Sequence, residues 1–377
     1  MHNLETETFS QIYSGVLLNR QQMFSTHNKE NKKIHFLLQS IIYFIFIFIK
    51  IMLSKFLKQS YFNKKIIGLN FSVYKYRFKE LSPELTVIDY LYKKINKSQV
   101  RLHNYISLTA VIKLVYTKNS NDKKHYIKFE NNNFFYRFVC AAEYNLLDNL
   151  ISQNNFTEVI TAGLNDRYCI FLSAICKKRN INLSIIQHGA LTKFDGCYRI
   201  EADNFYYMYD FSKSYLKYFF KNTDTINFLP CEREFKHQEL GNIDNEVNIA
   251  FACTPSNIEL NFQIIDILLQ DLAPTVKVYI HPHPRENNKT YEKKYAHIKN
   301  VCITKKKFIN IKFLVTRISS LGVELKKTGI EPVFINLEGH ETDYLATGEY
   351  LAFEKIPEFK IWLNNNSPIA NMYHTGS

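Results

Sequence analysis

The second half of the chain alternates short apolar runs with longer amphipathic ones. Residues 158–162 and 183–187 are apolar runs that predict strands, and residues 165–180 between them have the spacing of an amphipathic helix. The same alternation returns later, with predicted strands at 247–252, 276–280, 313–315 and 332–335, and predicted helices at 257–272 and 321–328, the last closed by Gly329. Strand, helix and strand in succession make βαβ units, whose strands run parallel in a covered sheet.

The rest of the chain divides less sharply. Residues 136–150 predict a helix, and the apolar runs 69–76 and 105–115 predict strands. Residues 221–245 are polar and predict an interdomain linker. We therefore predict an α/β fold with two Rossmann-type domains, residues 61–235 and 236–377, that face a cleft and follow an N-terminal extension, residues 1–60. Ligands of such sheets bind beyond the carboxyl ends of the strands.

An apolar segment of the extension, residues 34–53, is flanked by basic residues. Its unbroken apolar core, residues 41–49, is shorter than the about 20 residues that span a membrane. Between residues 50 and 79 the chain has no acid and eight basic residues: Lys50, Lys55, Lys58, Lys64, Lys65, Lys75, Arg77 and Lys79. The pattern favours a helix that lies on an anionic membrane surface. A buried element of the first domain and a full span are the alternatives.

Composition narrows the class of protein. The chain has 377 residues, of which 46% are hydrophobic and 22% are charged, and this composition argues against a mainly disordered chain. Its formal net charge is +13. Its seven cysteines include no C-x-x-C pair, so neither a disulfide framework nor a zinc knuckle is expected, and a reducing compartment is the simpler interpretation. The 25 Tyr and 30 Phe also allow a non-enzymatic binder of anionic polymer such as single-stranded nucleic acid. Because the basic residues cluster beside the apolar segment, we expect a membrane surface and no nucleic acid.

Three polar motifs stand where predicted strands end. The first is Gln187-His188-Gly189, in which the histidine can donate to an oxygen or act as acid or base. The second is the run His281 to Arg285, HPHPR, whose prolines hold two imidazoles and a guanidinium at the sheet edge, where an anion can be met. The third is Ser319-Ser320 at a helix start, which suits phosphate.

Each motif also has a purely structural interpretation. His188-Gly189 can be a turn, HPHPR can be an ordinary loop, and Ser319 can be a plain helix cap. Neither a carboxylate nor a third histidine follows the two histidines of HPHPR at the sequence spacing of metal ligands, so we expect no metal. The joint occurrence of the three motifs at strand ends is what favours a binding site.

HPHPR at 281–285, followed by the pattern S-S-x-G-x-E-x-x-x-x-G-x-x-P-V at 319–333, resembles the C-terminal half of bacterial GT-B glycosyltransferases. The pattern is most similar to enzymes that use CMP-activated acidic sugars, namely bacterial sialyltransferases and polysialyltransferases and capsule Kdo transferases. The resemblance covers residues 157–340 and implies a GT-B-like fold. It implies donor binding by His281, His283, Arg285, Ser319, Ser320 and Glu324, with the serines and His283 on the cytidylate phosphate.

The sequence departs from that family at the base that activates the acceptor. The acid-acid-Gly motif of sialyltransferases is reduced to Asp195-Gly196, and Asp166 follows another predicted strand. Either aspartate is a candidate base, with His188 beside Asp195 as a further catalytic candidate and Glu201 and Asp203 next in line. The run Gln187 to Lys193 is also similar to CDP-polyol phosphotransferases of teichoic-acid type, and this family is the alternative assignment.

The resemblance implies an inverting glycosyltransferase without a metal cofactor. It would move a sialic acid or Kdo type sugar from a CMP-activated donor to a glycan or glycolipid acceptor, as in capsule or lipooligosaccharide synthesis. Residues 61–235 would be the acceptor side and residues 236–377 the nucleotide-sugar side. With the apolar segment, this predicts a peripheral enzyme on the cytoplasmic face of the bacterial inner membrane.

Overall fold

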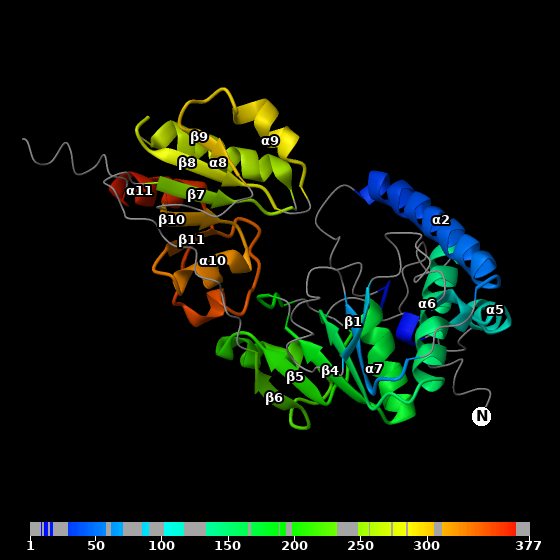
Figure 1. Cartoon of the computed structure of the whole chain (residues 1–377). Coiled ribbons are helices and arrows are strands. Elements are labelled where there is room, and N and C mark those ends of the chain that lie inside the picture. The colour runs from blue at the N-terminus through cyan, green and yellow to red at the C-terminus, as the bar shows by residue number, and fades with distance from the viewer. Residues whose placement is uncertain are drawn as a thin grey trace, which may run out of the picture. The chain divides into compact units, whose positions relative to one another are not determined.

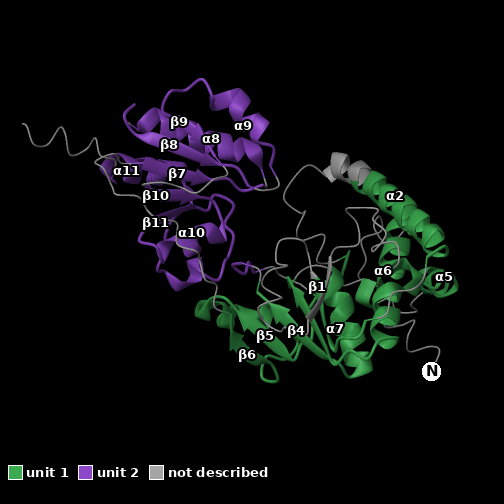
Figure 2. Ribbon diagram, in the orientation of Figure 1, with its two compact units in different colours: residues 1–188, 194–231 green, residues 189–193, 232–377 purple. Residues whose placement is uncertain are grey.

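The computed structural model describes most of the chain in sixteen ranges: 9, 11–13, 16–17, 29–57, 62–70, 85–89, 102–116, 133–164, 167–187, 189–193, 198–231, 248–255, 257–272, 274–283, 286–304 and 311–366. Two compact units make up the chain, one of residues 1–188 and 194–231 and the other of residues 189–193 and 232–377 (Figure 2). They are called unit 1 and unit 2 below.

Unit 1 contains a six-stranded, all-parallel sheet in the order β2-β1-β3-β4-β5-β6 (Figure 1). Its strands are β1 (Ile66–Asn70), β2 (Leu85–Asp89), β3 (Glu158–Ala162), β4 (Asn182–Ile186), β5 (Asn204–Tyr207) and β6 (Asn227–Pro230), and its helices include α2 (Lys29–Ser54), η1 (His103–Tyr105), α5 (Leu108–Tyr116), α6 (Phe134–Ser152), α7 (Arg167–Arg179) and η2 (Asp210–Tyr218). The crossover from β3 through α7 to the adjacent parallel strand β4 is the βαβ unit that the sequence predicts.

Unit 2 contains a second six-stranded, all-parallel sheet, in the order β12-β11-β10-β7-β8-β9. Its elements are β7 (Asn248–Ala252), α8 (Ile258–Asp271), β8 (Lys277–His281), α9 (Asn288–Tyr295), β9 (Val301–Ile303), β10 (Ile311–Thr316), α10 (Ser320–Lys326), β11 (Glu331–Ile335), η3 (Leu345–Thr347), β12 (Leu351–Phe353) and α11 (Ile356–Asn366). Counted within the unit, this is the doubly-wound order 3-2-1-4-5-6. The direction of winding reverses between β7 and β10.

Alternation along β7 shows how the sheet of unit 2 is covered. Ile249 and Phe251 lie in the cluster that also contains core residues of α8 and α11, whereas Ala250 and Ala252 lie in the cluster beside α10. Successive side chains of a strand point to opposite faces, so both faces of this strand are buried. The small alanines let α10 approach the sheet closely, and that approach shapes the candidate site.

The predicted fold class, α/β with two Rossmann-type units after an N-terminal apolar helix, is confirmed. The strands predicted at 158–162, 183–187, 247–252, 276–280, 313–315 and 332–335 and the helices at 136–150, 165–180, 257–272 and 321–328 are present with bounds shifted by a few residues. Gly329, which has a φ of 84°, ends the turn after α10 as expected.

Two predictions about unit 1 are wrong. The run 105–115 was expected to be extended, but residues 108–116 form helix α5, because its buried residues Val111 and Val115 are four apart and share one helix face. The predicted linker, residues 221–245, contains the edge strand β6, which pairs with β5. Edge strands are half exposed and tolerate polar residues, so β6 resembles a linker in sequence. Residues 71–76 and 232–247 lie outside the described part of the chain.

Candidate functional site

Three strands of unit 2 end side by side. In the register of the sheet, Thr316 of β10 pairs with Ala252 of β7, and Ala252 pairs with His281 of β8. The segments after these strands therefore leave the sheet at one edge, at and beside the reversal point between β7 and β10. Doubly-wound sheets bind ligands at this point. The structure thus brings HPHPR and the Ser319-Ser320 pair to the same edge, with β7 between their strands.

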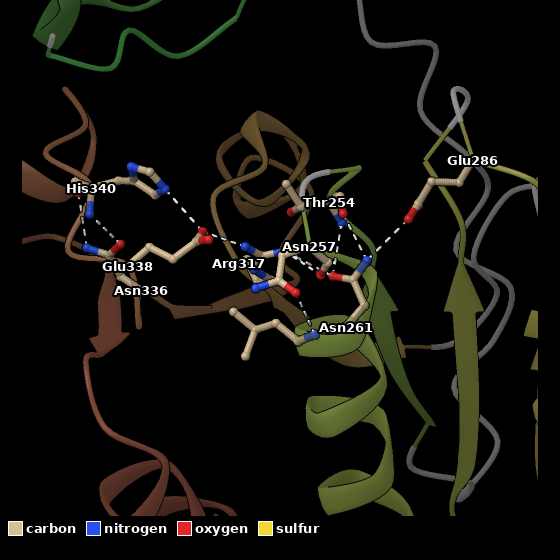
Figure 3. Close-up of polar contacts among 9 residues, drawn as sticks. Thr254, Asn257, Asn261, Glu286, Arg317, Asn336, Glu338 and His340 are labelled. Carbon is tan, nitrogen blue, oxygen red and sulfur yellow. Dashed lines mark hydrogen bonds and ion pairs between the residues drawn. The ribbon is translucent and has the colours of Figure 1, made fainter. Parts of the chain in front are cut away.

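Arg317 lies at the centre of this edge. Its side chain is 1% exposed, and its guanidinium pairs with the carboxylate of Glu338. Its Nη1 also donates to the backbone oxygen of Asn257 at 3.3 Å and to Oδ1 of Asn261 at 3.4 Å (Figure 3). A buried guanidinium needs such acceptors to replace its lost water. Arg317 therefore joins the segments that follow β7, β10 and β11, and we call these four residues the Arg317 network.

The segment after β11 is held by its own polar contacts. The Asn336 side chain accepts from the backbone N–H of His340 at 2.8 Å and donates to the His340 backbone oxygen at 3.0 Å. The imidazole Nε2 of His340 lies 3.1 Å from the carboxylate of Glu338 that also faces Arg317. The turn thus presents Glu338 to Arg317 in a fixed position (Figure 3).

Asn261 connects the Arg317 network to the HPHPR loop. Its Nδ2 donates to the Thr254 backbone oxygen at 2.8 Å and to Oε1 of Glu286 at 3.2 Å. The other carboxylate oxygen of Glu286 accepts from the backbone N–H of His283 at 2.8 Å, and the Tyr291 hydroxyl donates to Oε1 at 2.7 Å. Glu286 therefore fixes the backbone of His283, one of the predicted donor-binding residues.

His281 is fixed through its ring. Its Nδ1 lies 2.9 Å from the backbone oxygen of Thr304, so Nδ1 carries the proton in this contact. Nε2 is then the acceptor nitrogen of the neutral ring, and protonation would make it a second donor. Pro284 and the predicted donor-binding residue Arg285 lie outside the described residues.

Ser319 and Ser320 start α10 at the same edge. The Ser319 hydroxyl accepts from the backbone N–H of Leu321 at 3.2 Å, as in an ordinary N-cap, and no hydrogen bond of the Ser320 hydroxyl is formed within the described residues. Two positions on, a Cβ at Gly322 would lie 2.6 Å from Cζ of Phe334 on β11. Glycine is therefore required here, because α10 packs directly on the sheet. The predicted residue Glu324 is buried on this helix.

The segment 189–193 belongs to this site by its contacts, although it directly follows β4 of unit 1 in sequence. Lys193 donates from its backbone N–H to the Glu341 backbone oxygen at 2.8 Å and pairs with the Glu341 carboxylate at 2.6 Å. The backbone N–H of Asp343 donates to the Leu191 backbone oxygen at 2.8 Å. A Cβ added to Gly189 would lie 3.4 Å from Oγ of Ser320. The Gly189 backbone thus lies beside the Ser320 hydroxyl.

Burial keeps the remaining titratable groups at this edge neutral. It raises the pKa of the Cys253 thiol to about 12 and raises the pKa of the Tyr291 phenol, to which the neighbouring Cys253 also contributes. The charged side chains at this edge include Arg317, Glu338 and Glu286 and the Lys193–Glu341 pair.

The predicted catalytic residues Asp166, His188 and Asp195 all lie outside the described residues. The next candidates, Glu201 and Asp203, precede β5 and line a polar pocket of about 520 Å³ at the amino edge of the sheet of unit 1. Glu201 pairs there with Lys177 and Lys221, and Asp203 accepts from the backbone N–H of Leu183 at 2.7 Å. Their position opposite the ligand-binding edge removes them as base candidates.

Sequence reasoning missed Arg317, Asn261 and Glu338. Arg317 had one available signal, since it is a charged residue directly after an apolar strand and two positions before the serine pair. Asn261 and Glu338 had none, because a polar residue in the first turns of a helix and an acid in a loop are common on protein surfaces.

No protein-family model and no curated protein matches the sequence. Among solved structures, the chain is similar to a UDP-GlcNAc 2-epimerase from Methanocaldococcus jannaschii in complex with UDP-GlcNAc and UDP, at 11% identity over 80% of this chain and 92% of that one, with a TM-score of 0.48. The glycosyltransferase of kitacinnamycin aligns at 9% identity over 82% and 92%, with a TM-score of 0.48. The wall teichoic acid polymerase TagF, soaked with CDPG, aligns at 11% over 92% and 91%, with a TM-score of 0.44. All three TM-scores lie below 0.5, so we derive the function from the residues of the chain itself.

Proposed function

We propose that the protein is an inverting glycosyltransferase that uses a CMP-activated acidic sugar. The observation that carries the proposal is the shared edge of β10, β7 and β8, where the HPHPR histidines and the Ser319-Ser320 pair both leave the sheet. We infer the nucleotide, CMP, and the class of sugar from the resemblance of these motifs to those of CMP-sugar transferases.

The chemistry of the edge suits a leaving cytidylate. In the transfer, the acceptor oxygen forms a bond to the anomeric carbon, and the bond from that carbon to the phosphate oxygen breaks with its electron pair on CMP. Charge therefore develops on the phosphate, and donors already aimed at it stabilise the transition state. We assign this role to the Ser320 hydroxyl and to an imidazolium at His283. The Glu286 carboxylate accepts from the backbone N–H of His283 at 2.8 Å and so fixes that residue's backbone. The base that takes the acceptor proton would be Asp195 or Asp166.

The experiment compares cytidine and uridine nucleotides as ligands of the full chain. CMP is expected to raise the melting temperature, and a CMP-sugar to release CMP only when acceptor is present. His283→Ala should lower turnover about 10²–10³-fold, the scale for loss of a preorganised donor. Its control is His297→Ala, an exposed histidine of the same unit, which should leave turnover unchanged. Stabilisation by UDP but not by CMP, or full activity of His283→Ala, would contradict the proposal.

A second candidate is transfer of a polyol phosphate from a CDP-activated donor. What supports it is the segment 189–193, which carries the Gly and Lys of the teichoic-acid-type pattern and runs beside Ser320. In this reaction the acceptor oxygen attacks phosphorus, and CMP again leaves. Because both reactions release CMP, the mass of the product separates them: an added sugar supports the first candidate, and an added polyol phosphate supports the second.

A further inference from the structure

Helix α2 has its polar residues on the inside. Ser40, Lys50 and Ser54 are 1%, 1% and 2% exposed, whereas the side chains of many apolar residues of the same helix point outward: Leu37, Leu38, Ile42, Ile45, Phe46, Phe48, Ile49, Met52 and Leu53. Lys50 is the single Asp, Glu, Lys or Arg residue between positions 34 and 54. A helix that faces water normally shows the reverse pattern. The outer face of α2 therefore carries no charge at all between Leu37 and Leu53.

The inner face is fixed on α6. The Phe36 and Phe44 rings lie 5.0 Å and 4.8 Å, between centroids, from Tyr136 and Phe138 of that helix. Asn133, which caps α6, donates to the Ser40 hydroxyl at 3.3 Å. The end of α2 is tied as well, since Asn104 donates to the Leu57 backbone oxygen at 2.7 Å. From Phe36 to its end, α2 is thus packed on the rest of unit 1 by one face (Figure 1).

The outer apolar face continues beyond α2. Phe48 stacks on Phe44 at 6.2 Å, Phe44 contacts Phe134 at 6.3 Å, and Phe134 contacts Tyr116 of α5 at 6.3 Å. Tyr116, Phe134 and Ile112 are themselves exposed. These residues and the outward residues of α2 form one continuous apolar surface over three helices, which we call the α2 face.

We propose that the α2 face inserts into one leaflet of an anionic membrane, with α2 lying in the plane of the surface. The exposed positions of α2 cover about half of the helix circumference at 3.6 residues per turn, which is wider than the narrow stripe that pairs two helices in a coiled coil. The charged residues next to this face are basic: Lys55, directly after the end of α2, and Lys113, beside Ile112 on α5, are exposed, and residues 31–70 contain no acid. An anionic leaflet matches both the width of the apolar face and the charge of the residues next to it.

A full span does not fit the contacts of α2. Residues 36–54 are long and apolar enough to cross a membrane, with a mean hydropathy of 2.3. A spanning helix would expose Lys50, Ser40 and Ser54 to lipid or would need α6 in the membrane with it. Flat insertion leaves those three residues in their contacts and needs no change in unit 1.

The test measures binding of the full chain to vesicles of phosphatidylcholine with and without phosphatidylglycerol. Ile45, which is 48% exposed on the α2 face, is changed to Asp, and Ile361, which is 63% exposed on α11 of unit 2, is changed to Asp as the matched control. Ile45→Asp should weaken binding to anionic vesicles about tenfold or more, because a carboxylate is costly below the headgroups, whereas Ile361→Asp should bind like the wild type. Both variants should keep the wild-type melting temperature, because both side chains are already exposed.

The lysines next to the α2 face are tested separately. Changing Lys55 and Lys113 to Gln should weaken binding to anionic vesicles about fivefold per lysine and leave binding to neutral vesicles unchanged. Equal binding of wild type and Ile45→Asp would overturn the proposal, and so would absence of wild-type binding to anionic vesicles at low salt. A wild-type dimer in solution that Ile45→Asp converts to a monomer, without vesicle binding, would assign the α2 face to a second copy of the chain instead. None of these results depends on the identity of the nucleotide.

Discussion

The strand ends of the two units are fastened in different ways. In unit 2 one buried guanidinium, Arg317, joins the segments after β7, β10 and β11. In unit 1 the buried amide of Gln187 follows β4, donates to the Ser212 hydroxyl at 2.7 Å and accepts from the Met208 backbone at 2.8 Å. The Arg317 guanidinium thus fixes three loops relative to one another, whereas the Gln187 amide connects the end of β4 to the loop after the neighbouring strand β5. The edge of unit 2 is therefore organised before a ligand arrives.

Unit 1 does contain a buried ion pair, but it lies between helices. Arg167 at the start of α7 meets the carboxylate of Glu143 on α6 at 2.6 Å, and the Tyr168 hydroxyl donates to the same carboxylate at 2.7 Å. Burial raises the pKa of Glu143, although Arg167 opposes that shift. Among the described residues, the Arg167–Glu143 pair of unit 1 joins α7 to α6, whereas Arg317 of unit 2 joins the segments that follow three strands.

Replacement of Arg317 should have the largest effect. Arg317→Met removes the cation from the half-buried Glu338 carboxylate and the donor from Asn257 and Asn261. Loss of one partner of a fully buried pair costs about 3–5 kcal/mol, and the partial exposure of Glu338 places the expected loss at about 3 kcal/mol. We expect a lower urea midpoint and no CMP binding, and partial recovery of stability in the double variant Arg317→Met with Glu338→Gln. A wild-type midpoint in Arg317→Met would show that the pair contributes nothing.

Arg167→Met is the matched change in unit 1. It should destabilise the protein on a similar scale, yet at low temperature the folded fraction should bind CMP with wild-type affinity, because the pair that it breaks joins α6 to α7. If Arg167→Met and Arg317→Met lose CMP binding alike, the proposed difference between the two units is wrong.

Gln187→Leu should have an intermediate effect. It removes two hydrogen bonds, one to the buried Ser212 hydroxyl and one from the half-buried Met208 N–H, and each hydrogen bond contributes about 0.5–1.5 kcal/mol. Urea denaturation checks this loss. Ser212→Ala, which removes one of the two hydrogen bonds, should cost less. A larger loss in Ser212→Ala would show that the hydroxyl has a more important role than its contact with Gln187.

The smallest effect concerns alkaline pH. The pKa of the Cys253 thiol is raised from an ordinary 9.0 to about 12 by burial, so the folded chain keeps its proton where the unfolded chain loses it. The unfolded state then binds fewer protons between pH 9 and pH 12, and stability falls as pH rises through this window. In Cys253→Ala the urea midpoint should fall less steeply with rising pH, because the contribution of this one thiol to the decline is removed. An unchanged slope would show that the thiol does not contribute, since Tyr291, Tyr295 and Tyr344, whose pKa values burial also raises, remain in the variant.

The sequence predicted β7, α8, β8, β10, α10 and β11 of unit 2 because each is an apolar or amphipathic run with its own start or stop signal, but it did not predict α9, β9, η3, β12 and α11. Gly329 ends a helix, and Asn257 caps one by accepting from the Leu260 backbone at 3.3 Å. The strand-end histidines and serines were also found from local pattern. The Arg317 network was not, because its members are 56 residues or more apart in the pairs Arg317–Asn257 and Arg317–Asn261, and only the strand order brings them together. Segment 34–53 was predicted to be apolar, but which side of helix α2 is buried depends on its packing against α6.

Segment 189–193 has a consequence for recombination between related genes. Unit 2 is assembled from two separate stretches of the chain, so one crossover near residue 231 would combine a new second stretch with an old first one. The inherited Lys193 and Thr192 would then face unfamiliar partners in place of Glu341 and Thr342. A graft of unit 2 that is meant to change the donor preference must therefore transfer both stretches together. Sequence change in either stretch is constrained by the other.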